Sequence, residues 1–418
     1  EKTSPKILID FGGFQVFDAA TVDTSILILR KELSRDAKPA LQAVRILNDF
    51  TPQADLEGYV QHNAVPVNEF SSESWIISTG AEYAVRKRIE EVGVPLKEWD
   101  TAIYRGILTG LNEAFIINGK KKDELIAEDP KSAEIIKPVL RGRDIKHYKV
   151  EFADLWIITT FPALQIDINR YPAIMSYLKT FGKRIEQSGD PGCRKKTSNK
   201  WFEVQDTIAY HTEFEKEKIV YPDIMRLPRG NNDFSSYPYF YLDKKNFHVE
   251  ATNFIMTGDG IYLIIAILSS RLGVYAFTKF FAGPQFDEKG FRYKKEYLQN
   301  FPIPKVDPAD QHPYEILVDC ILFAHEKGMT SEASTLEWVV NVMIYGLYFE
   351  EVMKKARCYI NDRVAEVVKP FKPGDTDAFK TEYVMSLALF FLKDKTVYPG
   401  MLHSKNVEPV RIIHGEKK

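Results

Sequence analysis

The chain has 418 residues, of which 44% are hydrophobic and 27% are charged, a mixture typical of a globular protein. This mixture excludes a disordered polymer, a collagen-like repeat and a disulfide scaffold. The 56 lysines and arginines nearly balance the 58 aspartates and glutamates, which excludes a uniformly basic nucleic-acid coat but allows a local basic face. The length predicts two or three domains.

The cysteines and the apolar runs indicate the compartment. Cys193, Cys320 and Cys358 are far apart and no pair has metal-ligand spacing, so we expect a reducing cytoplasm and not a secreted disulfide framework. The most apolar run, residues 261–268, is too short to span a membrane and predicts a core helix. We expect no membrane partner and find no signal peptide. The chain opens on Glu1, which suggests a segment of a longer protein.

The first 100 residues divide into two parts. Residues 7–10 (ILID) and 25–31 (SILILRK) are β-branched apolar runs, which predict two strands. About 30 residues cannot bury a core alone, so residues 1–32 are expected to be remnant strands of a larger sheet. Residues 33–100 are interpreted as a mixed connecting segment, in which residues 81–99 form a helix that stops at Gly93.

The rest of the chain predicts an α+β fold. In residues 101–304, strand-like runs such as DLWIITTF and KIVYPDI alternate with loops, which favours a mixed, mostly antiparallel sheet with packed helices. The proline-rich stretch 301–308 marks a boundary. Residues 305–418 have helical periodicity. One wide apolar stripe there comprises Leu336, Val339, Val340, Met343, Ile344 and Leu347.

The near-neutral total charge hides an asymmetry. Residues 101–300 carry 30 basic and 25 acidic residues, a net charge of +5, whereas the remainder carries 26 and 33, a net charge of −7. The excess lies in three clusters, RGRDIKHYK (141–149), CRKKTSNKW (193–201) and FRYKK (291–295). Such clusters can neutralise DNA phosphates, although a solvated charged loop is their more frequent role.

Motifs for catalysis and metal binding are absent from the sequence. It contains no P-loop, GxSxG, HExxH or CxxC, and the glycines of DFGGF lack dinucleotide-binding spacing. His147, His211 and His248 have no partners at ligand spacing. We therefore predict no catalytic residue, no metal site and no cofactor site in this segment.

Several segments, taken in order, resemble one protein family. They are IYRGILTGLNEAFII, IIKPVLRGRDIKHY, WFEVQD with FEKEKIVYPDI, and YLQNFPIP. Together they resemble the TaqI-like C-terminal specificity (target recognition) domain of bacterial adenine-N6 DNA methyltransferases and type IIG restriction-modification enzymes. The opening DFGGFQVFDAATVDTSILILRK is similar to the final strands of the preceding methyltransferase domain, and LEWVVNVMIYGLY looks like the helical stretch that commonly follows. The likeness covers residues 7 to about 350.

The resemblance implies sequence-specific recognition of double-stranded DNA. The parent protein would use S-adenosylmethionine and flip the target adenine out of the duplex. The Asn/Asp-Pro-Pro-Tyr/Phe catalytic loop of the family and its S-adenosylmethionine-binding strand do not occur here, so we expect a recognition region without catalytic power. Its other partners would be the methyltransferase domain, and a nuclease domain if the parent has one, of the same polypeptide.

Candidate DNA-contacting residues come from the family segments and from basic loops. The TGLN and RGRD segments are shared by enzymes with different targets, so their residues are expected to support the fold or to contact phosphate. Base reading is expected in residues 185–200 and 226–236. Trp201 can stack on a base or pack in a core, and Asn112 can pair with adenine or form a turn. The full set is Arg105, Thr109, Asn112, Arg141, Arg143, Lys146, Tyr148, Arg194, Lys195, Lys196, Lys200, Trp201, Arg226, Arg229 and Asn231.

Two other functions remain open at this point. One is a working S-adenosylmethionine-dependent adenine methyltransferase whose catalytic loop has diverged. The other is a protein-interaction scaffold that docks partners on the helical residues 311–400, although the apolar stripe there is better explained as core.

Overall fold

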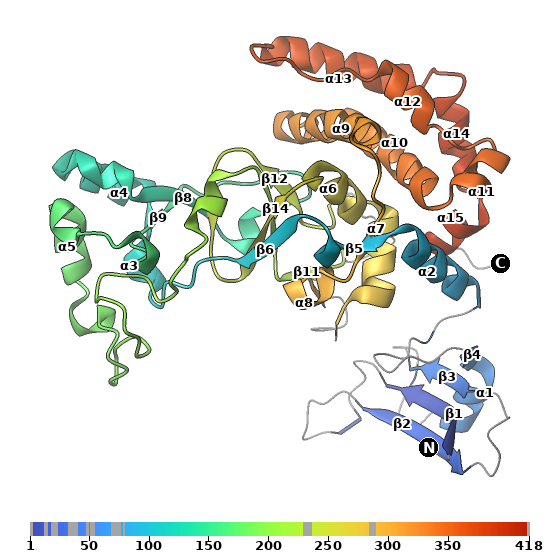
Figure 1. Ribbon diagram of the computed structural model, residues 1–418, viewed down its shortest axis with the longest axis horizontal. Helices are drawn as coiled ribbons and strands as arrows, with labels where there is room; N and C mark the ends of the chain where they lie inside the picture. Colours follow the sequence, from blue (N-terminus) through green and yellow to red (C-terminus); the bar gives the residue numbers. More distant parts are fainter. Residues whose placement is uncertain are drawn as a thin grey trace.

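A computed structural model describes residues 3–11, 16–17, 24–31, 41–46, 50, 55–67, 77, 80–228, 236–283 and 290–415. It confirms the predicted α+β class. Small, mostly antiparallel sheets occupy the first three quarters of the chain, and helices form the last quarter (Figure 1). No single helix among the described residues is long and apolar enough to cross a membrane; one helix pair, sharply bent at 70°, passes that test only when its two halves are combined.

The N-terminal sheet has the strand order β2-β1-β3-β4. Both predicted strands are present. The elements are β1 (Thr3–Asp10), β2 (Ser25–Lys31), β3 (Leu41–Arg45), α1 (Leu56–Asn63) and β4 (Val65–Val67). β1 pairs antiparallel with β2 and parallel with β3. Every residue of β2 is exposed, although this edge strand carries four consecutive large apolar side chains, 39–51% exposed.

Helix α2 (Gly80–Val92) ends at Gly93, as predicted. A Cβ at Gly93 would lie 2.6 Å from the backbone carbon of Pro302, so only glycine permits this approach. The approach lets β5 (Val94–Pro95) pair with β16 (Pro302–Ile303), while η1 (Leu96–Glu98) follows β5. The segment YLQNFPIP therefore closes the central region against the end of α2.

The central sheet is antiparallel throughout, with the order β12-β10-β14-β6. Its strands are β6 (Thr101–Arg105), β10 (Lys218–Pro222), β12 (Tyr241–Asp243) and β14 (Asn253–Gly258). Helix α6 (Ile261–Ser269) packs against it and continues through α7 (Arg271–Ala276) into the π-helical segment η8 (Phe277–Phe281). The predicted core helix at 261–268 is confirmed, since α6 buries seven of its residues.

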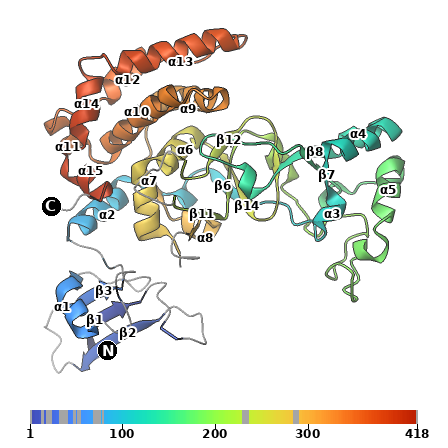
Figure 2. The same ribbon diagram turned by 180° about the vertical axis from the view of Figure 1, so that it is seen from behind.

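A second sheet, with the order β13-β8-β9-β7, forms what we call the distal lobe, residues 107–217 and 246–249. The lobe lies at the opposite end of the molecule from helices α11 and α15 (Figures 1 and 2). It has its own hydrophobic core, which includes Phe115, Ile157, Ile174 and Phe214. Its strands and α-helices are α3 (Asn112–Phe115), β7 (Ile116–Asn118), α4 (Gly119–Glu128), β8 (Ile136–Leu140), β9 (Leu155–Ile158), α5 (Pro172–Lys179) and β13 (His248–Val249). Its 3-10 turns are η2 (Pro130–Glu134), η3 (Gly142–Asp144), η4 (Pro162–Leu164), η5 (Ile168–Arg170), η6 (Gly182–Ile185) and η7 (His211–Glu215).

A two-stranded ribbon joins the central region to the helices. It pairs β11 (Ile224–Arg226) with β15 (Gly290–Arg292) and is followed by α8 (Lys295–Leu298). Met225 and Phe291 form a cross-strand pair that is buried in the core, which leaves Ile224, Arg226 and Arg292 on the opposite face.

The C-terminal region is helical, as predicted. Its elements are α9 (Pro308–Lys327), α10 (Thr330–Tyr348), α11 (Glu350–Lys355), α12 (Asn361–Val367), α13 (Asp377–Phe391), α14 (Val397–Ser404) and α15 (Glu408–Ile413). Five of the six stripe residues on α10 are buried, and Leu347 is half-buried. One continuous core joins α2, α6, α7 and these helices, so the stripe is core and not a free docking face.

Candidate nucleic-acid interface

Segments far apart in the sequence meet around Arg105, the last residue of β6. The Arg105 Nε donates a hydrogen bond to the carbonyl of Ala251 at 2.8 Å. The backbone N–H of the next residue, Gly106, donates a hydrogen bond to the backbone carbonyl of Asn253 at 2.8 Å. A Cβ at Gly106 would lie 2.1 Å from the backbone oxygen of Glu250. Glu250 in turn donates to Leu140, at the start of the RGRD segment. The close approach that Gly106 permits therefore brings the first two family segments together.

Arg194 ties the TGLN segment to the basic segment 193–201. Its side chain is 4% exposed and donates to four backbone carbonyls. These are the carbonyls of Ile185 (2.9 Å), Thr109 (3.0 Å), Glu203 (2.8 Å) and Trp201 (2.6 Å). The guanidinium also lies 5.0 Å from the centre of the Phe115 ring. Burial lowers its pKa to about 10, with Glu186 opposing the shift, so Arg194 remains charged at neutral pH.

The loop that Arg194 holds presents its neighbours to solvent. Lys195 and Lys196 are exposed, and none of the described groups is placed as a salt-bridge partner for either. Gly189 and Gly192 have φ values of +80° and +84°, which glycine adopts without strain, so the chain can turn sharply on both sides of Asp190. The loop after α5 projects from the end of the distal lobe (Figure 1). The loop therefore presents exposed cationic side chains on a backbone that Arg194 holds in place.

The RGRD segment forms a tight structural turn. Arg141 makes a bidentate contact with the buried Asp144, at 3.0 Å from Nε and 2.8 Å from Nη2. The hydrogen bond with Asp144 raises the pKa of Arg141. Arg143 points to solvent, and its carbonyl accepts a 2.7 Å hydrogen bond from the Nζ of Lys146. Arg141 thus stabilises the turn, and Arg143 is the arginine that a ligand can reach.

The ribbon of β11 and β15 adds a second cationic area next to Arg105. Asp223, just before β11, interacts electrostatically with Lys294, Arg292 and Arg105. Burial raises the pKa of Asp223, and these three cations oppose the shift. Arg105 also interacts with Asp206 in the WFEVQD segment. Arg105 therefore lies where the ribbon and the WFEVQD segment adjoin.

Three of the candidate residues are buried. For Tyr148 and Arg194 this corrects the prediction of a DNA contact, and for Thr109 it favours the alternative that the TGLN segment supports the fold. Thr109 is 1% exposed, and its hydroxyl donates to the Asn112 side chain at 2.6 Å. Tyr148 is 2% exposed in the main core. Arg194 is the interior clamp described above. They were chosen from a family segment or a basic cluster, but loops give no periodicity from which the direction of a side chain can be predicted.

The remaining candidates lie at the surface or outside the described residues. Asn112, the first residue of α3, accepts a hydrogen bond from the Thr109 hydroxyl and remains exposed. Trp201 is half-buried and packs edge-on against Phe202, which favours its packing role. Lys200 is exposed and lies 3.6 Å from Glu203. Arg226 is exposed on β11. Arg229 and Asn231 lie outside the described residues.

A cavity of about 800 Å³ lies in the distal lobe. Acidic and basic side chains both line it, among them Glu134, Lys137, Arg170 and Glu215, so its charge does not single out one class of ligand. Its wall includes His248, which is 6% exposed and stacks on Phe214 with ring centres 4.6 Å apart. Burial, helped by the charges of Lys218 and Lys137, lowers the pKa of His248 to about 3.

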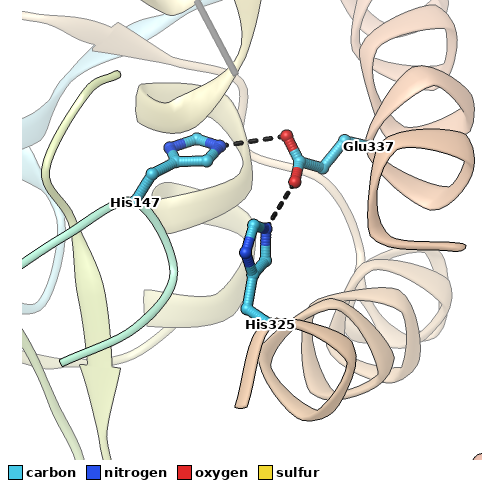
Figure 3. A group of neighbouring side chains, drawn as sticks. All are labelled: His147, His325 and Glu337. Carbon is cyan, nitrogen blue, oxygen red and sulfur yellow. Dashed lines mark hydrogen bonds and ion pairs between the residues drawn. The ribbon is translucent and has the colours of Figure 1, made fainter. Parts of the chain in front are cut away.

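His147, His325 and Glu337 form a cluster that spacing in the sequence does not indicate (Figure 3). The Nε2 atoms of His147 and His325 lie 3.0 Å and 2.7 Å from the two carboxylate oxygens of Glu337. Burial raises the pKa of Glu337, but the two neighbouring imidazoles, His147 above all, outweigh it and hold the pKa at about 2. The residues were not predicted as a group, because His147 and Glu337 are 190 positions apart.

No protein-family model matches the chain. The chain is 21% identical over 296 residues to the type II methyltransferase M.PaeR7I of Pseudomonas aeruginosa. This alignment covers 69% of the chain and 43% of that enzyme, so the chain spans less than half the length of this curated relative. This alignment supports the expected resemblance to DNA methyltransferases as far as a distant likeness to a type II methyltransferase.

Two solved restriction-modification enzymes also show distant likeness. The type IIL enzyme MmeI, solved in complex with DNA, is 11% identical with a TM-score of 0.43, covering 93% of this chain and 46% of MmeI. The type IIG restriction endonuclease BpuSI is 16% identical with a TM-score of 0.38, covering 83% of this chain and 44% of BpuSI. These TM-scores are too low to establish a shared fold.

Proposed function

We propose that the chain is the DNA-recognition region of a restriction-modification adenine-N6 methyltransferase. In this proposal the central region and distal lobe are a TaqI-like target recognition domain, and the N-terminal sheet is the last part of a methyltransferase domain. The observation that carries it is the likeness over 296 residues to the type II methyltransferase M.PaeR7I. The whole protein would use S-adenosylmethionine, and this segment would bind double-stranded DNA without a cofactor.

The distribution of exposed cations supports DNA as the ligand. Lys195 and Lys196 on the projecting loop and Arg143 beside the RGRD turn are all exposed. The buried Arg194 holds the backbone next to the two lysines through its hydrogen bonds to carbonyls. The backbone of this loop is therefore already ordered before a ligand binds the lysines. Cations on a fixed backbone suit phosphate contacts, which position a protein on a duplex without reading its sequence.

The TGLN and RGRD segments serve this proposal as scaffold. Thr109, Arg141 and Asp144 are engaged within the protein, through the carbonyl of Thr109 and the Arg141–Asp144 pair. Segments common to enzymes with different target sequences would be expected to hold the fold in this way. Base reading would then fall to exposed side chains outside these two segments, such as Arg226 on the ribbon.

The exposure of β2 supports a larger N-terminal sheet. Its residues Ile26 to Leu29 alternate between the two faces of an edge strand, and all four are at least 39% exposed. An edge strand that is apolar on both faces is normally covered, because it otherwise invites aggregation. The other part of a methyltransferase domain in the same polypeptide would cover it.

Selection from a pool of randomised DNA duplexes tests the proposal. The chain is incubated with the pool at low salt, and the bound duplexes are recovered and sequenced. The expected result is a single enriched motif, with affinity falling steeply as salt rises because counterions are released from the phosphates. Binding without an enriched motif would contradict sequence recognition, and no binding at low salt would contradict the DNA role of this segment.

Calorimetric titration with S-adenosylmethionine separates this proposal from a diverged but active methyltransferase. The recognition region alone is expected to give no binding heat. A dissociation constant of about 1–100 μM, in the range of ordinary enzyme–ligand affinities, would favour the active enzyme instead.

A further inference from the structure

The cluster of His147, His325 and Glu337 draws its side chains from three separate segments (Figure 3). His147 lies in the loop after η3, His325 in the last turn of α9, and Glu337 in the middle of α10. The relevant nitrogen and oxygen atoms all lie within 4.8 Å of one another. The loop belongs to the recognition region and the helices to the C-terminal region, so the cluster bridges the two.

The hydrogen bonding of His147 leaves a place for a positive charge. Its Nδ1 lies 2.9 Å from the carbonyl oxygen of Pro238, which can only accept, so Nδ1 carries a hydrogen. In a neutral imidazole the Nε2 lone pair then points at the Glu337 oxygen, 3.0 Å away. Two lone pairs at this distance repel each other, so a cation must lie between them. That cation is either a proton on Nε2 or a metal ion.

The donor set and its surroundings favour a metal ion. Two imidazoles and one carboxylate are ligands that zinc accepts, at about 2.0–2.2 Å for nitrogen and oxygen. Ligand atoms at such distances from a tetrahedral ion lie about 3.3–3.6 Å apart. The two imidazole nitrogens, at 2.7 Å and 3.0 Å from the two Glu337 oxygens, would each have to move outward by roughly 0.5 Å to reach that spacing. A metal-bound histidine typically donates its other ring N–H to a backbone carbonyl, as His147 does to Pro238.

We propose that His147 Nε2, His325 Nε2 and the Glu337 carboxylate bind a zinc-like divalent cation, with water in the fourth position. Small outward shifts of the two imidazoles make room for the ion. The surrounding residues hold the ligands in place, since Tyr148 stacks on His325 with ring centres 6.0 Å apart and is buried in the core. The ion would fasten the loop after the RGRD turn to the hairpin of α9 and α10.

Metal titration of the purified chain tests this site. After treatment with a chelator and its removal, Zn²⁺ is titrated against a competing indicator, and Co²⁺ is titrated by visible absorption. The expected stoichiometry is about one ion per chain, with Co²⁺ giving the intense bands of a tetrahedral site. Zn²⁺ is also expected to raise the melting temperature, because it binds only the folded arrangement.

Variants locate the binding. His325→Ala and Glu337→Gln are each expected to lose the stoichiometric binding. The matched control is His312→Ala on the same helix, which removes a histidine from the exposed pair His312–Glu315 and is expected to bind as the wild type does. If a cluster variant does not fold, the Co²⁺ spectrum of the wild-type chain still decides. No stoichiometric binding by the wild type, or binding retained by folded Glu337→Gln, would overturn the proposal and leave a proton in the cluster.

Discussion

The Arg194 guanidinium donates a 3.0 Å hydrogen bond to the carbonyl of Thr109, 85 positions earlier in the chain. The same side chain holds three further carbonyls, at Ile185, Glu203 and Trp201. One buried cation thus fixes both the TGLN segment and the basic loop, and its charge is used within the protein. The adjacent Lys195 and Lys196 are left for a ligand.

Replacing Arg194 is expected to lower stability. Arg194→Ala leaves four carbonyls without their donor, and we expect a loss of about 3 kcal/mol in the free energy of unfolding. Arg194→Lys should recover only part of this, because an ammonium group cannot reach acceptors arranged around a planar guanidinium. Urea unfolding measures both. Lys195→Ala is the control and should change stability by less than about 0.5 kcal/mol; equal losses in the two alanine variants would refute the interior role of Arg194.

Replacing the exposed lysines is expected to weaken DNA binding without loss of stability. In the double variant Lys195→Ala/Lys196→Ala, the slope of log affinity against log salt should become shallower by about 2, one for each lost phosphate contact. Fluorescence anisotropy with a labelled duplex measures the slope. The matched control, Lys393→Ala/Lys395→Ala, removes two exposed lysines between α13 and α14, away from the distal lobe (Figure 1). An unchanged slope in the first variant would place the phosphate contacts elsewhere.

The ion pair of Lys218 and Asp243 is fully buried at the centre of the molecule. The Lys218 Nζ lies 2.6 Å from the Asp243 carboxylate, and both side chains are 0% exposed. Lys218→Met should cost about 3–5 kcal/mol, because it leaves a buried carboxylate without its cation. The double variant Lys218→Met/Asp243→Asn should lose less than the sum of the two single changes. Lys216→Met, which breaks the pair between the exposed Lys216 and the partly buried Glu213, should cost at most about 1 kcal/mol, because the lost cation itself lies in solvent. Thermal and urea unfolding give these differences, and an additive double variant would show that the two charges are not coupled.

His248 is expected to make stability depend on pH. Its pKa is about 3 in the folded chain and 6.5 as the ordinary value, so between these limits the unfolded chain binds a proton that the folded chain does not. The contribution of His248 to the free energy of unfolding is therefore fully present above pH 6.5. The free energy of unfolding falls as the pH drops below that value, by about 2 kcal/mol at pH 5. His248→Phe keeps the ring stacked on Phe214 and should lose correspondingly less stability between pH 7 and pH 5. His403→Phe, at an exposed position on α14, should behave as the wild type; if His248→Phe also does, the buried imidazole does not carry the effect.

Much of the fold follows from local sequence. Apolar β-branched runs predicted β1 and β2, and the stripe on α10 and the run at 261–268 predicted buried helices. Gly93 was predicted to end α2, and it also permits the contact with Pro302. These features succeed because periodicity and backbone freedom are properties of neighbouring residues. The predicted domain limits at residues 32, 100 and 304 stay predictions. One hydrophobic core continues from α2 into the C-terminal helices.

The sequence alone determined the α+β class, the position of the main strands and helices, and the segments in which positive charge gathers. Only the tertiary structure decided which of those charges face outward. Arg194 and Lys195 are adjacent and both positively charged, yet one is enclosed by carbonyls and the other is exposed. Likewise, His147 meets Glu337 only because the loop after η3 packs on α10. Loops have no side-chain periodicity, so contacts between distant segments, and not residue type, set the environment of each charged group.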